Sequence, residues 1–171
     1  MERRRQPWDP TVRDTAYSRV SFALTPTEDP EDKVFMETCG PWLDHPRSYP
    51  DNLRLFPSKV TAVFKAVADA PGATLVHCSG GRDRTGLITA MLLHLTGVEI
   101  AAIQENYAEA FRVASRHVAR MAELHPEQTH ERPYSIDEIE VRITERTEVL
   151  SAWWLICGQL DTRHSSRFVL R

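Results

Sequence analysis

A regular spacing of apolar residues predicts a helix that begins near Ser58. One face of this helix would carry Val60, Val63, Phe64 and Val67, which follow one another at i, i+3, i+4 and i+7. The Ser58 side chain can cap the first turn, and Pro71-Gly72 provides residues that end a helix. The sequence therefore predicts an amphipathic helix that packs against a core through this face.

Two shorter apolar segments predict strands. In residues 17–24 the apolar side chains alternate loosely, so that Val20, Phe22 and Leu24 fall on one side. Residues 73–76 form a short apolar run whose length suits a buried strand better than a helix. A glycine-rich loop follows, and residues 87–95 then predict a helix that is apolar on most sides. This order of strand, loop and buried helix favours an α/β protein.

The second half of the chain is predicted to be helical almost throughout. Ser135-Ile136-Asp137-Glu138 has the pattern of a capping box for a last long helix. Residues 44–57 hold three prolines and predict a loop that can line a cleft. We expect an extended N-terminus over residues 1–16 and a single domain over residues 17–171. Its predicted fold is α/β, with a small, mostly parallel central sheet flanked by helices and the glycine loop at the C-terminal end of the central strand.

Charge and composition exclude several classes of function. Lys and Arg number 21 against 24 Asp and Glu, so no overall positive field attracts nucleic acid and any anion site must be local. No apolar run approaches the roughly 20 residues that span a bilayer, and no export signal is visible. Cys39, Cys78 and Cys157 form no Cys-x-x-Cys pair. We expect a cytoplasmic protein that binds no metal and no cofactor.

The loop His77–Gly86, with the sequence HCSGGRDRTG, carries the candidate chemistry. Its glycines allow a tight curl that turns backbone N–H groups inward at a helix N-terminus, where they bind phosphate. Arg84 follows Cys78 by six residues and can hold two phosphate oxygens in a bidentate fork. We predict that the phosphate-binding residues are Ser79, Gly80, Gly81, Arg82, Asp83 and Arg84.

Cys78 is the predicted nucleophile of this loop. The helix dipole and the nearby arginines favour its thiolate, which can attack phosphorus and form a phosphocysteine. Arg84 would stabilise charge on the transferring phosphoryl group. Thr85 could donate a hydrogen bond to the sulfur, and His77 could fix the loop through backbone contacts. The leaving oxygen needs a proton, and Asp83, Asp44 and Asp51 are all candidate donors, of which we prefer Asp83.

These ten residues resemble the signature of the cysteine-dependent protein tyrosine phosphatase superfamily. Within it, the Asp before the arginine and the Thr-Gly after it resemble bacterial tyrosine and phosphoinositide phosphatases whose loop usually has the sequence HCxxGKDRTG. Arg82 stands in the lysine position. The resemblance implies that Asp83 is the acid and that the basic residue before it is tied to activity on phosphoinositides. It also implies a phosphoric monoester hydrolase that acts on phosphotyrosine, and also on phosphoserine, phosphothreonine or phosphoinositides.

Members of this family usually begin with a strand-rich segment that carries an Arg-Asp-Leu-Gly-Gly motif, and no such motif precedes Tyr17. The chain resembles the part of the family that follows these strands, so we expect an exposed sheet edge through which two copies could associate. Two other functions stay open. One is a noncatalytic phosphate-binding remnant of a phosphatase. The other is a rhodanese-like sulfurtransferase, against which Arg84 and the Thr85-Gly86 ending count.

Overall fold

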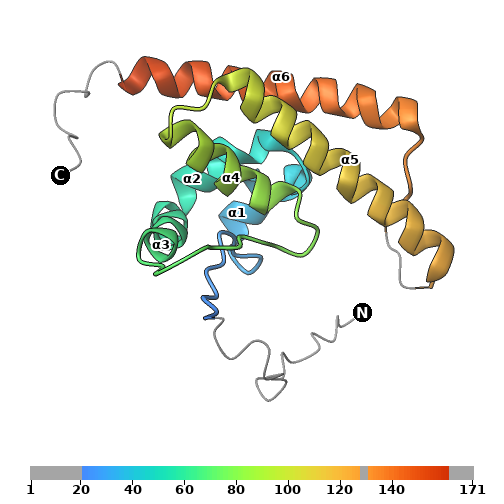
Figure 1. The fold of residues 1–171 in the computed structure, drawn as a ribbon, viewed down its shortest axis with the longest axis horizontal. Helices are drawn as coiled ribbons and strands as arrows, with labels where there is room; N and C mark the ends of the chain where they lie inside the picture. The colour runs from blue at the N-terminus through green and yellow to red at the C-terminus, as the bar shows by residue number, and fades with distance from the viewer. Residues whose placement is uncertain (1–20, 128–130, 162–171) are drawn as a thin grey trace.

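The structure is a computed structural model that describes residues 21–127 and 131–161, with side chains as far as Trp154 (Figure 1). Every regular element within these residues is helical. In chain order they are α1 (Lys33–Thr38), the 3-10 helices η2 (Gly40–Trp42) and η3 (Pro46–Ser48), α2 (Tyr49–Leu55), α3 (Pro57–Ala68), α4 (Asp83–Leu95), α5 (Ile100–Leu124) and α6 (Ile136–Asp161). None of the helices in these ranges combines the length and the apolar character that crossing a membrane requires.

The predicted central sheet is wrong, because no strand occurs in residues 21–127 and 131–161. Residues 73–76 run without regular structure, and Leu75 is 85% exposed. Residues 21–24 of the first predicted strand also have no regular structure, and Leu24 is 96% exposed. Residues 17–20 lie outside the described residues. An apolar pattern favours an extended segment but does not supply the neighbouring strand that its backbone must pair with. The predicted phosphate loop therefore follows an unpaired segment, and the expected sheet edge has no counterpart in the described residues.

Helix α4 lies at the centre of the molecule and explains why its sequence is apolar on most sides. Leu87 and Ala90 pack into a core with Tyr49 of α2, Ile103 and Tyr107 of α5, and Leu150, Trp153 and Trp154 of α6. Ile88 packs instead against Val60 and Val63 of α3, the face predicted from the valine spacing. The helix that starts at the predicted loop is thus held from several directions.

Helices α5 and α6 form a long antiparallel pair beside the shorter helices (Figure 1). Phe111 of α5 is fully buried in a cluster with Ala108 of the same helix and Ile143 of α6. The predicted capping box is confirmed, because the Ser135 N–H donates to Glu138 Oε2 at 2.8 Å and the Glu138 N–H donates to Ser135 Oγ at 3.2 Å. Residue 136 therefore begins α6 as the pattern indicated.

The stretch 44–57 was predicted to be a loop because of its prolines, yet most of it is helical. Each proline lies in the first turn of an element: Pro46 in η3, Pro50 in α2 and Pro57 in α3. Proline is well tolerated there, since the first N–H groups of a helix have no acceptor within it. These prolines therefore start helices instead of breaking them.

Candidate active site

The predicted phosphate loop leads directly into the N-terminus of α4, whose first residue is Asp83. Gly81 has a φ of 65°, a left-handed conformation that residues with a side chain rarely adopt. The first N–H groups of α4 have no partner within the helix, and together with the helix dipole they favour an anion. Ser79, Gly80 and Gly81 are exposed, so a phosphate group can approach the loop from solvent.

Cys78 is half-buried at the base of this loop, and its surroundings favour the thiolate. Burial is the largest influence and raises the pKa of the thiol, but hydrogen bonds from the Thr85 hydroxyl, from the N–H groups of Thr85 and Gly81, and the charge of Arg84 together bring the pKa below its ordinary value. The Thr85 hydroxyl is buried and makes no other hydrogen bond within the described residues. His77 is exposed, with Nδ1 3.3 Å from the Cys78 carbonyl oxygen.

Arg84 lies on the solvent side of the loop and pairs with a carboxylate that the sequence did not single out. Its Nε atom is 3.6 Å from Oε2 of Glu28, a residue in the segment before α1. The Arg84 side chain is 46% exposed and that of Glu28 only 20%. Burial raises the pKa of Glu28, an effect that Arg84 opposes and Asp83 reinforces.

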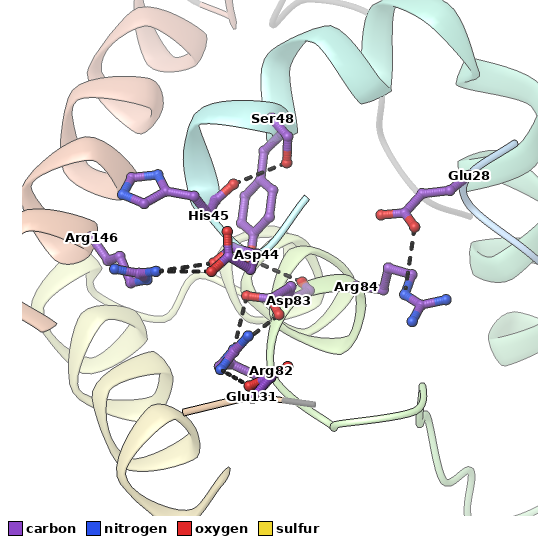
Figure 2. Close-up of polar contacts among 10 residues, drawn as sticks. Glu28, Asp44, His45, Ser48, Arg82, Asp83, Arg84, Glu131 and Arg146 are labelled. Carbon is purple, nitrogen blue, oxygen red and sulfur yellow. Dashed lines mark hydrogen bonds and ion pairs between the residues drawn. The ribbon is translucent and has the colours of Figure 1, made fainter. Parts of the chain in front are cut away.

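Arg82 points to the opposite side of Asp83 from Arg84 (Figure 2). Its Nε atom donates to both Asp83 oxygens, at 2.9 and 3.2 Å, and Nη1 lies 3.5 Å from Glu131 Oε2. Only 8% of Arg82 is exposed. The structure therefore places Arg82 as a partner of Asp83 and Glu131, away from Arg84.

The three aspartates considered as proton donors lie in different environments. Burial raises the pKa of Asp83, although Arg82 opposes this effect. Asp44 lies close to it and pairs with Arg146 of α6, whose Nη2 is 3.6 Å from Oδ2 (Figure 2). Asp51 pairs with Arg54 at 3.1 Å on an exposed turn of α2. Asp83 is thus the candidate acid that belongs to the loop itself.

A thiol with a lowered pKa, an arginine and a partly buried aspartate therefore lie around one helix N-terminus. A sequence model of the tyrosine phosphatase family matches residues 1–160. The chain belongs to the tyrosine phosphatase family. The resemblance predicted from the loop is confirmed. A tyrosine-protein phosphatase from Nostoc commune is 36% identical over 98 residues, which cover 54% of this chain and 30% of that protein. The chain thus matches less than a third of that phosphatase, and no solved structure matches it.

In this member of the tyrosine phosphatase family, Gly86 lets two tyrosines reach the back of the loop. A Cβ atom at Gly86 would lie 3.0 Å from the Tyr49 hydroxyl and 3.1 Å from the Tyr107 ring. The Tyr49 hydroxyl donates to the Asp83 carbonyl oxygen at 2.9 Å. Gly86 therefore serves close packing behind the loop, from a position within α4.

A buried aromatic ring supports the two arginines on the far side of Asp83. The guanidinium carbons of Arg82 and Arg146 lie 5.3 and 4.8 Å from the centre of the Phe111 ring. Arg146 is 2% exposed and donates to the Asp44 carbonyl oxygen at 3.2 Å. This tyrosine phosphatase family member thus connects its last long helix to the surroundings of the loop.

Sequence reasoning missed Glu28, Tyr49 and Arg146, and only the last left a local signal. Arg146 falls between Ile143 and Leu150 at helical spacing, so a charge interrupts an apolar stripe. A charge so placed is buried and needs a partner. Glu28 and Tyr49 reach the loop only through the tertiary fold, and nothing near them in the sequence indicates it.

Proposed function

We propose that this chain is a cysteine-dependent phosphatase that hydrolyses phosphate monoesters through a phosphocysteine intermediate. The observation that supports it most directly is the placement of Cys78, whose pKa is lowered by donors of the loop despite burial, beside Arg84 at the start of α4. A thiolate and an anion cradle in one loop are what attack on a phosphate monoester dianion needs. The family match supports the same reaction class.

In the first step, the Cys78 thiolate gives its electron pair to phosphorus while the bond from phosphorus to the ester oxygen breaks. The departing oxygen takes a proton from the Asp83 carboxyl group. Arg84 and the N–H groups at the start of α4 hold the equatorial oxygens, where positioning and charge provide most of the acceleration. The products of this step are the free alcohol and phosphocysteine.

In the second step, water attacks phosphorus and the bond from phosphorus to sulfur breaks. The water proton passes to the Asp83 carboxylate, the electron pair returns to Cys78, and inorganic phosphate is released. The Thr85 hydroxyl stabilises the sulfur as it becomes a thiolate again. The carboxyl group that served as acid is thereby restored.

The raised pKa of Asp83 supports this acid role, because a carboxyl group with a raised pKa keeps its proton to a higher pH. Comparing Asp83→Asn with Asp51→Asn tests it, since Asp51 is a carboxylate on the solvent-exposed side of α2. On a poor leaving group such as an alkyl phosphate, we expect Asp83→Asn to lose about 10²–10⁴-fold in kcat. The loss should be much smaller on 4-nitrophenyl phosphate, whose oxygen leaves without a proton. Equal losses on both esters would refute the assignment.

The reaction itself is tested by incubating the purified chain and its Cys78→Ser variant with an aryl phosphate. We expect phosphate release from the wild type alone, and acid quenching should trap one phosphoryl group on Cys78, detectable by mass spectrometry. Absence of cysteine-dependent release, combined with retained binding of inorganic phosphate, would instead support a noncatalytic phosphate-binding protein. Sulfur transfer from thiosulfate would support the sulfurtransferase.

Phosphotyrosine is the substrate that we favour within this class. Arg82, in the position that the resemblance links to phosphoinositides, is buried and paired with Asp83 and Glu131. It therefore adds little charge to the outer rim of the loop. Phosphate release should be faster from a phosphotyrosine peptide than from a soluble phosphoinositide, and the reverse order would show that Arg82 leaves its partners.

We propose a cytoplasmic location, since the cysteines lack a pairing motif.

A further inference from the structure

Glu28 is a carboxylate at the proposed active site that the reaction described above does not use. It comes from the segment before α1, and its Oε2 atom lies 3.6 Å from Nε of Arg84. Figure 2 shows the carboxylate directed at that nitrogen, on the other side of Asp83 from Arg82. The Glu28 side chain is 20% exposed, so it is well shielded for a charged group. A shielded carboxylate beside the phosphate-binding arginine needs an explanation.

The backbone around Glu28 is anchored, which fixes the place from which its side chain reaches. Lys59 of α3 donates to the Glu28 carbonyl oxygen at 3.4 Å and to Asp29 Oδ2 at 3.2 Å. Asp32 caps α1 by accepting from the Phe35 N–H at 2.8 Å. Thr27, directly before Glu28, is buried. Contacts to two helices therefore hold this segment beside the loop.

A carboxylate beside this arginine can either compete with phosphate or hold the arginine for it. A competitor would occupy the two terminal nitrogens, because this fork is the part of a guanidinium that matches two phosphate oxygens. In the described part of the chain, the ion pair of Arg84 engages Nε instead. Nη1 and Nη2 stay available, so the geometry agrees with holding.

We propose that Glu28 is a positioning residue that holds Arg84 through Nε, so that its two terminal nitrogens face the phosphoryl group. This inference rests on the proposed phosphatase function. Without the carboxylate, Arg84 is a long and partly exposed side chain that samples several rotamers. An arginine that is free to turn binds phosphate more weakly and stabilises the transition state less, because misplacement by about 1 Å can cost 10²-fold in rate.

The test compares Glu28→Gln, which keeps the shape and removes the charge, with Glu28→Asp, which keeps the charge at a shorter reach. Glu31→Gln is the matched control, because Glu31 is an exposed carboxylate of the same segment. With an aryl phosphate, Glu28→Gln should lower kcat/KM by about 10–100-fold, mostly through kcat. Glu28→Asp should recover part of this loss, and Glu31→Gln should match the wild type. A role limited to stability would lower the unfolding midpoint and leave kcat unchanged.

Affinity for inorganic phosphate, measured by calorimetry, gives a readout that does not need turnover. Glu28→Gln should weaken phosphate binding, and in an Arg84→Ala background the same change should have an effect below about twofold. Tighter phosphate binding by Glu28→Gln would show that Glu28 competes with the ligand, and unchanged affinity would show that it does not hold Arg84. Either result overturns the proposal. If the wild type and Cys78→Ser are equally inactive, the proposed function fails, while the calorimetry still decides the role of Glu28.

Discussion

Replacing Gly86 by alanine sets two opposing effects against each other at the back of the loop. Gly86 lies within α4, and alanine is favoured over glycine in a helix interior by about 1 kcal/mol. The new Cβ atom, however, would lie 3.0 Å from the Tyr49 hydroxyl and 3.1 Å from the Tyr107 ring, closer than side chains normally approach. Neither tyrosine can withdraw easily, since they are 2% and 3% exposed and Tyr49 is bonded to the Asp83 carbonyl.

The contact should outweigh the helix propensity. Forcing an extra methyl group into a well-packed core costs about 1–3 kcal/mol. Subtracting the gain in propensity leaves a net loss of about 0–2 kcal/mol in the free energy of unfolding. The residues that must shift carry the loop, because Asp83 and Arg84 lie in the same helical turn as Gly86. A displacement there should lower kcat/KM by about tenfold or more, a larger effect than the change in stability suggests.

Urea unfolding and aryl phosphate turnover measure the two effects on the same Gly86→Ala preparation. Gly72→Ala is the matched control, because a Cβ atom there would meet nothing within 4 Å. It should be neutral or stabilising by up to about 1 kcal/mol, with unchanged turnover. If Gly86→Ala is instead stabilised by about 1 kcal/mol and keeps its kcat/KM, propensity alone governs the site. The packing behind the loop would then be irrelevant to catalysis.

Three further predictions concern the thiol, the last helix and its core. The rate at which iodoacetamide alkylates Cys78 should reach half its maximum at a lower pH than for a free thiol, because the pKa of Cys78 is lowered. A midpoint equal to that of free cysteine would contradict the hydrogen-bond donors assigned to the sulfur. Cys39 should stay unlabelled, because it is buried and burial raises its pKa. Ser135→Ala should lower the free energy of unfolding by about 1 kcal/mol without changing kcat, since it removes the hydroxyl oxygen that accepts from the Glu138 N–H. Phe111→Ala should cost about 3–5 kcal/mol in urea unfolding, and a cost under about 1 kcal/mol would show that the core closes around the gap.

The parts of the fold that sequence predicted well are those whose cause is local. The valine face of α3 depends on spacing within one helix, and the capping box at Ser135 depends on residues three apart. The family resemblance of the loop from His77 to Gly86 is equally local, since its glycines, thiol and arginine lie within ten residues. Side chains near in sequence had to be near in space, so the pattern alone was enough.

The parts that failed depend on partners elsewhere in the chain. Residues 73–76 have the apolar character of a strand, but pairing needs a second segment at about 4.8 Å, and the described residues provide none. The prolines of residues 44–57 are ambiguous in sequence, because a proline can mark either the end of a helix or the start of one. Only the packing of Tyr49 against α4 and α6 decides that α2 forms there.

Asp83, the proposed acid, shows how a motif can locate a residue without determining when it carries its proton. Its position before Arg84 is encoded within the loop, but its pKa depends on residues elsewhere. Burial has the largest effect and raises the pKa, Asp44 raises it further, and Arg82 and Arg146 lower it. Arg146 reaches this site only because α6 lies along α5, where it packs over the same Phe111 ring as Arg82. A chain with these ten loop residues and a neutral residue at position 146 would keep the motif and hold the Asp83 proton to higher pH. Helix α6 is therefore part of the proposed proton chemistry of the site, although the loop motif includes none of its residues.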